Sequence, residues 1–224
     1  MPYRRTDAVV RRQAARHKAI IESARQIAAE NGMGAVQVAL VAERAGIAAG
    51  TVYRYFPSKT ELVGALVTAV SEREITALRR AADTAPGPLS ALAAAIATFA
   101  ARALRERRLS WAVLAEPVDA QAEAFRFEYR RALAAEFERR INAAMNATHL
   151  PRQDAALAAP ALVGALVEGL VGPLASGAPD HAINAREAVQ MLTLFSLRGL
   201  GVVDARARGL VVQIALPAIE SGAG

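Results

Sequence analysis

Apolar residues recur at steps of three and four along most of this chain, which is the spacing of helices with one buried face. In residues 14–31 that face holds Ile20 and Ile27, and an Asn-Gly pair ends the segment. A second stripe covers residues 38–45, Gly46 interrupts it, and another short helix follows. Two short helices joined by a glycine turn are typical of a helix-turn-helix that reads DNA.

The rest of the chain continues the helical pattern. Ser58 follows a proline and is placed to cap a helix that runs to about Arg80, with Glu61 completing a capping box. After the break at residues 85–88, the spacing predicts helices at about 89–107, 109–115, 119–147, 154–175, 181–199 and 203–220, without strand-like alternation. We therefore expect an all-α fold. A basic arm and a three-helix DNA-binding domain occupy residues 1–60, with the helix-turn-helix at about 37–56, and a larger helical domain occupies residues 61–224.

The predicted helices at 154–175 and 181–199 are apolar on several sides. Small or apolar residues mark both of them: Ala161, Gly164, Ala165, Gly169 and Gly172 in the first, and Val189, Leu192, Leu194 and Phe195 in the second. Small residues let helices approach closely, and an apolar surface too wide for one core is a candidate oligomer interface. We expect a homodimer through this pair, with a helix pair buried inside a monomer as the alternative. Pro160 and Pro173 should bend or end the first helix.

The positive charge of the chain is confined to its first quarter. Residues 1–60 carry ten basic and four acidic side chains, a balance of 10 − 4 = +6, whereas the other 164 residues carry 17 of each. This asymmetry indicates that one end of the molecule meets a polyanion. A solvated basic face is the plainer alternative, but it would leave the asymmetry to chance.

Composition narrows the classes of protein to which the chain could belong. Without cysteine there is no disulfide framework, thiolate nucleophile or cysteine-bearing metal site. The uncharged stretch at residues 84–101 contains prolines and has its large apolar residues in one stripe, so it predicts a bundle helix and no membrane span. The N-terminal residues lack the apolar run of a secretory signal, and a cytoplasmic location is the simplest inference.

The sequence contains no catalytic constellation. His17, His149 and His181 stand apart, and the patterns HExxH, GxSxG, GxxxxGK and GxGxxG are missing. We therefore expect no enzyme activity, cofactor or metal. A helical enzyme with an accessory DNA-binding domain is an alternative that lacks a catalytic group.

Residues 42–62, AERAGIAAGTVYRYFPSKTEL, resemble the TetR family of one-component transcriptional repressors. They follow the family pattern A-x-x-A-G-(V/I)-x-x-G-(T/A)-(L/V)-Y-x-(Y/H)-F-x-(S/N)-K-x-x-L nearly throughout. The rest of the chain agrees only in length, helix pattern and the position of the apolar helix pair. The departures are Gln37 and Ala48, where the family usually has a hydroxyl that caps a helix, and a lost cap costs about 1 kcal/mol. With Gln37 and Ala48 at these positions, the chain resembles a branch of the family that includes regulators of sterol and lipid catabolism.

The resemblance implies which residues meet DNA. Gly50 would let the recognition helix approach closely, and Tyr55 and Lys59 would hold the phosphate backbone. Phe56 is expected in the core. The full set of expected contacts is Gln37, Arg44, Ala49, Gly50, Thr51, Tyr53, Arg54, Tyr55 and Lys59. Their chemistry agrees, because hydroxyls and cations bind phosphates and arginine can bind guanine through two hydrogen bonds.

The resemblance also implies an effector pocket among the C-terminal helices. The residues expected near it are Phe99, Trp111, Phe125, Tyr129, Met145 and Phe195, with Arg130 or Glu168 as the polar anchor, and plain core packing is the alternative for each. The expected partners are operator DNA, an apolar or acyl-bearing small molecule and a second copy of the chain. The expected function is a repressor that such a ligand releases from a palindromic operator. A basic architectural DNA-binding protein without an effector is the main alternative.

Overall fold

The computed structural model describes residues 7–117, 120–173, 175 and 185–213. Regular structure in these residues is entirely helical, which confirms the all-α prediction. The elements in chain order are α1 (Asp7–Asn31), the 3-10 helix η1 (Met33–Ala35), α2 (Val38–Arg44), α3 (Ala49–Tyr55), α4 (Lys59–Asp83), α5 (Pro88–Arg105), α6 (Arg107–Leu114), α7 (Ala120–Asn146), α8 (Ala155–Leu170), α9 (Ala185–Gly199) and α10 (Asp204–Gln213). Among these helices, none combines the length and the apolar character that crossing a membrane requires.

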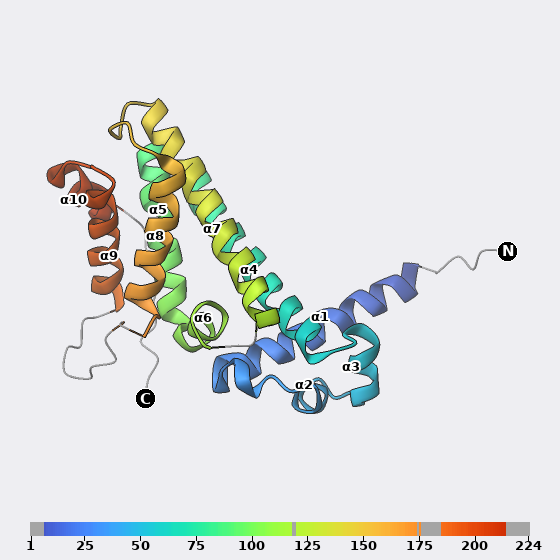
Figure 1. Ribbon diagram of the computed structural model, residues 1–224. Helices are drawn as coiled ribbons and strands as arrows, with labels where there is room; N and C mark the ends of the chain where they lie inside the picture. The colour runs from blue at the N-terminus through green and yellow to red at the C-terminus, as the bar shows by residue number, and fades with distance from the viewer. Residues whose placement is uncertain (1–6, 118–119, 174, 176–184, 214–224) are drawn as a thin grey trace.

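Helices α1, α2 and α3, together with η1, form a small unit that we call the head (Figure 1). Its core contains completely buried side chains from each helix, including Ile20, Val41 and Val52. Between α2 and α3 the chain turns at Gly46, whose φ of 64° lies in the left-handed region that glycine adopts without strain. The predicted helix-turn-helix is confirmed, and α3 is its second helix.

Helix α4 joins the head to the larger unit that we call the body, which consists of α5 to α10 (Figure 1). Ser58 caps α4 as predicted, because its Oγ accepts a hydrogen bond from the Glu61 N–H at 3.1 Å. From there α4 runs for 25 residues and lies against α1, α5 and α7. One rigid helix therefore belongs to the cores of both units, so that a shift of α4 in the body moves the head.

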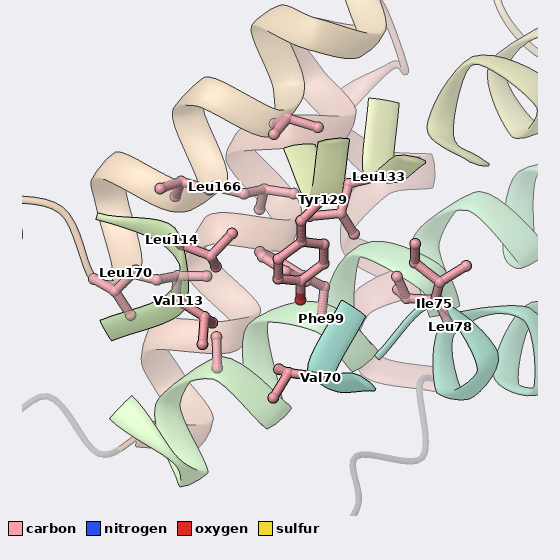
Figure 2. Packing of buried hydrophobic residues seen from close by; sticks show 14 of the residues in the cluster. Val70, Ile75, Leu78, Phe99, Val113, Leu114, Tyr129, Leu133, Leu166 and Leu170 are labelled. Atoms are coloured by element: carbon pink, nitrogen blue, oxygen red, sulfur yellow. The ribbon is translucent and has the colours of Figure 1, made fainter. Parts of the chain in front are cut away.

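The core of the body lies where α5, α7 and α8 meet, with α6 below them. Figure 2 shows Phe99 of α5, Tyr129 and Leu133 of α7, and Leu166 and Leu170 of α8 gathered around Leu114 of α6. All of these side chains are buried. Burial of apolar surface contributes about 25 cal/mol per Å², and this cluster therefore holds the helices of the body together.

Several boundaries differ from the sequence prediction. Helix α1 begins at Asp7 and not at residue 14, because residues 7–13 contain neither glycine nor proline and continue the helix. Helix α8 continues through Pro160 and ends at Leu170, before Pro173. Predicted helical positions 119, 174, 181–184 and 214–220 lie outside the described residues, and so does His181.

An ionic cluster around a buried carboxylate fastens the far end of α4 to α7. The Glu136 carboxylate, with 1% of its side chain exposed, pairs with Arg79 of α4 at 3.0 Å and with Arg139 and Arg140 of α7 at 2.6 and 2.9 Å. Arg140 also pairs with Asp83, the last residue of α4, at 2.7 Å. Burial is the largest influence on the pKa of Glu136 and raises it, but hydrogen bonds from the three guanidiniums outweigh burial and hold the pKa below its ordinary value of 4.5.

Candidate nucleic-acid interface and effector region

Helix α3 presents one side of its length to solvent. Ala49, Gly50, Tyr53 and Arg54 are exposed there, and Tyr53 retains 51% of its accessible surface. The opposite side holds the completely buried Val52. An exposed phenol and guanidinium beside small residues can reach phosphates and base edges in a major groove.

Gly50 lies on this exposed side, in the first turn of α3. A Cβ built at Gly50 would meet nothing within 4 Å, and its φ is not in the left-handed region. Neither packing within the protein nor the backbone therefore requires glycine here. Because Gly50 has no side chain, another molecule can approach the backbone of α3 more closely here than at the neighbouring positions.

Three aromatic residues at the end of α3 point to different surroundings. Tyr53 is exposed, Tyr55 is half-buried at the edge of the head, and Phe56 is 4% exposed in the core, as predicted. Thr51 is half-buried, and Lys59 is exposed in the first turn of α4. Tyr53, Tyr55 and Lys59 thus lie at or near the surface between α3 and the start of α4.

Two of the predicted contacts are engaged within the head. Arg44 forms a two-pronged ion pair with Glu30 of α1, with both N–O distances at 2.6 Å. Gln37 precedes α2 without capping it, and its Nε2 donates to the Gly34 carbonyl at 3.0 Å. Ala48 likewise leaves α3 without a side-chain cap. Arg44 and Gln37 therefore shape the head, and their contact with DNA stays a prediction.

A carboxylate from the body holds η1 of the head. Glu116, just beyond α6, accepts hydrogen bonds from the Met33 N–H at 2.7 Å and from the Gly34 N–H at 3.3 Å. Gly32 has a φ of 83°, and a Cβ there would stand 2.9 Å from the Glu116 carboxylate. Glycine at position 32 therefore serves both the turn after α1 and the approach of Glu116.

A second carboxylate holds the head from the other end of α6. Glu106 pairs with Arg25 of α1 and with Arg73 of α4, each at 2.9 Å. Helix α6 lies against α1 between these two attachments. This short helix of the body is thus fastened to the head by Glu106 where it begins and by Glu116 where it ends.

In the described part of the chain, the predicted effector residues lie in different surroundings. Phe99 and Tyr129 are core residues, each 3% exposed (Figure 2), and burial raises the pKa of Tyr129 above its usual range. Phe195 is 61% exposed on α9. Helix α9 turns the Phe195 side chain outward, away from the core that holds Phe99, and its contact with an effector stays a prediction.

Trp111, Phe125 and Met145 are half-buried at separate places. Trp111 lies on α6 with the Arg108 guanidinium 6.0 Å from its ring. The Phe125 ring rests on Gly64 of α4, where a Cβ would come within 2.4 Å of the ring. Phe125 therefore belongs to the contact between α4 and α7, close to the head.

The two predicted anchors, Arg130 and Glu168, do line a common groove between α7 and α8, with a volume of about 610 Å³. Apolar atoms from both helices form most of its walls, including Phe127, Pro160 and Val163. Arg130 connects the groove to α6, because its guanidinium donates to the Leu114 carbonyl. Leu114 is the last residue of α6 and lies two positions before Glu116.

Helices α8 and α9 each have an exposed apolar side. On α8, Leu157 is 69% exposed, and on α9, Met191 and Phe195 are 54% and 61% exposed. A Cβ at Gly164 would meet nothing within 4 Å, so α8 is open to close approach there. The residues chosen from the sequence as a dimer interface thus include an uncovered apolar surface.

Comparison with known proteins identifies the head. Residues 20–66 match the family described as bacterial regulatory proteins, tetR family. The head is therefore a DNA-binding domain of the TetR family of transcriptional regulators. The HTH-type transcriptional repressor KstR of Mycolicibacterium smegmatis is 51% identical over 51 residues, which are 23% of this chain and 25% of that protein. The chain thus matches about a quarter of the length of this curated relative.

Solved structures resemble this chain over most of its length. RolR in complex with resorcinol has a TM-score of 0.68 at 23% identity, covering 94% of this chain and 100% of that one. FadR from Bacillus subtilis in complex with stearoyl-CoA has a TM-score of 0.61 at 16% identity, covering 90% of this chain and 99% of that one. At these identities the likeness establishes a shared fold. The TetR family consists of regulators and not of enzymes, in agreement with the prediction from sequence.

Sequence reasoning missed the residues that fasten the head to the body. Glu106 and Glu116 have partners 81 and 83 positions away along the chain, and no local pattern marks such pairs. One signal was available, because both carboxylates flank the short predicted helix at 109–115.

Proposed function

We propose that the protein is a homodimeric repressor that binds a palindromic operator through α3 and leaves it when an apolar or acyl-bearing small molecule binds to the body. The observation that carries the DNA-binding part is the exposed side of α3, where Tyr53 and Arg54 stand beside Gly50. In this proposal α3 enters the major groove, and Tyr55 and Lys59 bind phosphates at its edge.

The uncovered apolar sides of α8 and α9 support the homodimer. Leu157, Met191 and Phe195 would lose their contact with water in an interface between two copies. A two-fold axis there would present two copies of α3 to the same face of a duplex. The operator would then be an inverted repeat with half-sites roughly 34–36 Å apart, or a multiple of that spacing.

The groove between α7 and α8 supports an apolar effector. Its volume of about 610 Å³ falls within the range of small-molecule sites, and Arg130 offers a guanidinium to a polar end of the ligand. Two proteins of the same fold were crystallised with small molecules, one with resorcinol and one with stearoyl-CoA. Walls formed by Phe127 and Val163 favour the apolar or acyl-bearing class over a small polar ring.

The contacts of α6 supply a route from the groove to the head. A ligand that displaces Arg130 from the Leu114 carbonyl would free the end of α6 and with it Glu116, which holds η1. The ligand must bind the released form more tightly than the DNA-bound form. Differential affinities of this kind are typically 1–3 kcal/mol.

The DNA-binding proposal is tested by footprinting the DNA that flanks the protein's own gene, followed by titration of the protected duplex against random duplex at fixed salt. Lys59→Ala should weaken binding to all sequences and reduce the slope of log affinity against log salt by about one. Tyr53→Phe should weaken binding without altering thermal unfolding. Equal affinity for protected and random duplex would favour an architectural DNA-binding protein instead.

The effector proposal is tested with Trp111, the only tryptophan, as the fluorescent reporter. Fatty acyl-CoAs, sterol intermediates and hydrophobic drugs should include a compound that changes its emission and lowers operator affinity together. Val163→Phe would narrow the groove without adding a second tryptophan, and it should weaken both responses while operator binding remains. If every compound leaves emission and operator affinity unchanged, the effector proposal fails and the DNA-binding proposal stands.

A further inference from the structure

The first turns of α1 extend beyond the core of the head. Among residues 9–19 every side chain is exposed except Gln13, which is half-buried, and Ile20 is the first completely buried residue. At 1.5 Å per residue this segment is about 16 Å long. Figure 1 shows it reaching past α3 at the N-terminal end of α1. We call residues 9–19 the α1 extension.

Positive charge covers the α1 extension. It carries Arg11, Arg12, Arg16 and Lys18, and residues 8–21 include no acid. No ion pair forms on any of these four cations within the part of the chain that the structure describes. By contrast, Arg25 and Arg44, the other arginines of the head outside α3, are held by Glu22, Glu106 and Glu30.

The α1 extension passes over the end of α3. The His17 ring lies 6.2 Å from the Tyr55 ring and 5.0 Å from the Phe56 ring, measured between centroids. Arg16 adjoins His17, and Arg12 lies one helical turn before Arg16 on the same side of α1. Arg12 and Arg16 therefore lie on the turns of α1 beside the end of α3, next to Tyr55, one of the residues proposed to hold phosphates.

Packing within the protein does not account for this segment. Val9 and Val10 are 38% and 49% exposed, so the extension buries little apolar surface. Arg12 and Arg16, four residues apart, repel each other and weaken an isolated helix. A polyanion that neutralises both cations removes the repulsion and releases its own counterions, which favours binding.

From these observations we infer that the α1 extension is a second DNA contact, in which Arg12 and Arg16 bind phosphates flanking the half-site that α3 reads. This inference rests on the proposed function, since it places α3 on the operator. It lengthens the footprint of each protomer beyond the helix-turn-helix. The contact is to phosphates, so it adds affinity and salt dependence without adding base preference.

The test compares full-length wild type with the double variant Arg12→Ala, Arg16→Ala on two duplexes. One is the footprinted operator with its natural flanks, and the other is trimmed to the inverted repeat. On the long duplex the variant should bind more weakly, with a salt slope lower by about two per protomer. On the trimmed duplex the wild type should fall to the affinity of the variant.

The matched control is Arg152→Ala, Arg206→Ala, which removes the same charge from exposed positions in the body that form no ion pair in the described chain. It should leave both the affinity and the slope unchanged. Circular dichroism should show equal thermal unfolding for all three proteins, because the four arginines are exposed.

Four results would overturn the inference. If the double variant keeps wild-type affinity and slope while Lys59→Ala loses both, the extension does not contact DNA and the proposed function stands. If the variant is weakened equally on both duplexes, Arg12 and Arg16 act within the half-site. If the wild type itself does not distinguish operator from random duplex, the proposed function fails. Binding to anionic vesicles that is lost in the variant, with operator binding intact, would assign the extension to a membrane surface.

Discussion

The head and the body treat their charged residues in opposite ways. In the head and at the start of α4, Arg54, Lys59 and the cations of the α1 extension face solvent without ion-pair partners in the described chain. Where α4 packs against the body, Glu136 of α7 is 1% exposed and pairs with three arginines, and Glu74 of α4 holds Arg102 of α5 at 2.5 Å. Free surface charge suits attraction of a polyanion, whereas paired and buried charge fixes how helices pack.

The two regions should also respond differently when a charged side chain is removed. Removal of an exposed cation from the head should change binding and leave stability unchanged. Removal of one member of a buried ionic cluster leaves its partners uncompensated and should change stability. Glu106 and Glu116 differ from both groups of charged residues, because they connect the two regions. Glu106 does so through an ion pair with Arg25, and Glu116 through a hydrogen bond from the Met33 N–H.

The largest expected effect comes from the exposed side of α8. Gly164→Arg should abolish the dimer and lower operator affinity by orders of magnitude, because a charge would enter the proposed interface at a position with no intramolecular neighbour within 4 Å. Light scattering and operator titration measure the two losses. Ala143→Arg, at an exposed position on α7, is the control and should remain dimeric. A Gly164→Arg protein that stays dimeric would place the interface elsewhere.

The buried cluster should dominate stability. Glu136→Gln should lower the free energy of unfolding by about 2 kcal/mol, because the buried Arg140 loses a carboxylate partner, whereas Arg79 and Arg139 are more than half exposed. Urea denaturation of the purified protein measures this change. Glu128→Gln breaks an exposed pair with Arg131 on the same helix and should cost about 0.5 kcal/mol or less. Equal costs for the two variants would contradict the distinction between buried and exposed pairs.

Gly50 should separate stability from binding. Gly50→Ala places a better helix former in α3 where nothing stands within 4 Å, so the protein should gain up to about 1 kcal/mol of stability. The same methyl group should weaken operator binding, because it lies on the side of α3 proposed to meet DNA. Thermal unfolding and operator titration on one preparation measure both changes. A variant that is more stable and binds normally would remove Gly50 from the interface.

The smallest effect concerns acid stability. The pKa of Glu136 is held below its ordinary value of 4.5, so the folded state favours the carboxylate more than the unfolded state does. Its contribution is present above that value and is lost as the pH falls through the lowered pKa. Unfolding free energy measured from pH 7 to pH 3 should decline at the acidic end, and Glu136→Gln should decline less steeply. Parallel curves would show that other carboxylates control acid unfolding.

Local rules were enough to predict the head. The apolar stripe containing Ile20 and Ile27, the turn at Gly46 and the cap at Ser58 each depend on residues within a few positions of one another. Such features follow from helical periodicity and backbone sterics, and the structure confirms them. Even here the predicted start of α1 at residue 14 was wrong. The helix begins at Asp7, because helix propensity extends it through residues that pack little against the core.

Tertiary structure decided the effector region and the connection between head and body. The sequence of α9 is apolar on several sides, and only its packing against α5 determines that Val189 is buried while Phe195 faces solvent. The attachment of Glu116 to η1 joins residues 83 positions apart, and the Glu136 cluster joins α4 to α7 across 57. The helical spacing of apolar residues therefore determined which segments are helices, and composition determined which end of the chain carries the net positive charge. Partners across space, and the choice of which apolar side faces inward, depend on the complete fold because burial is a property of all the packed helices together.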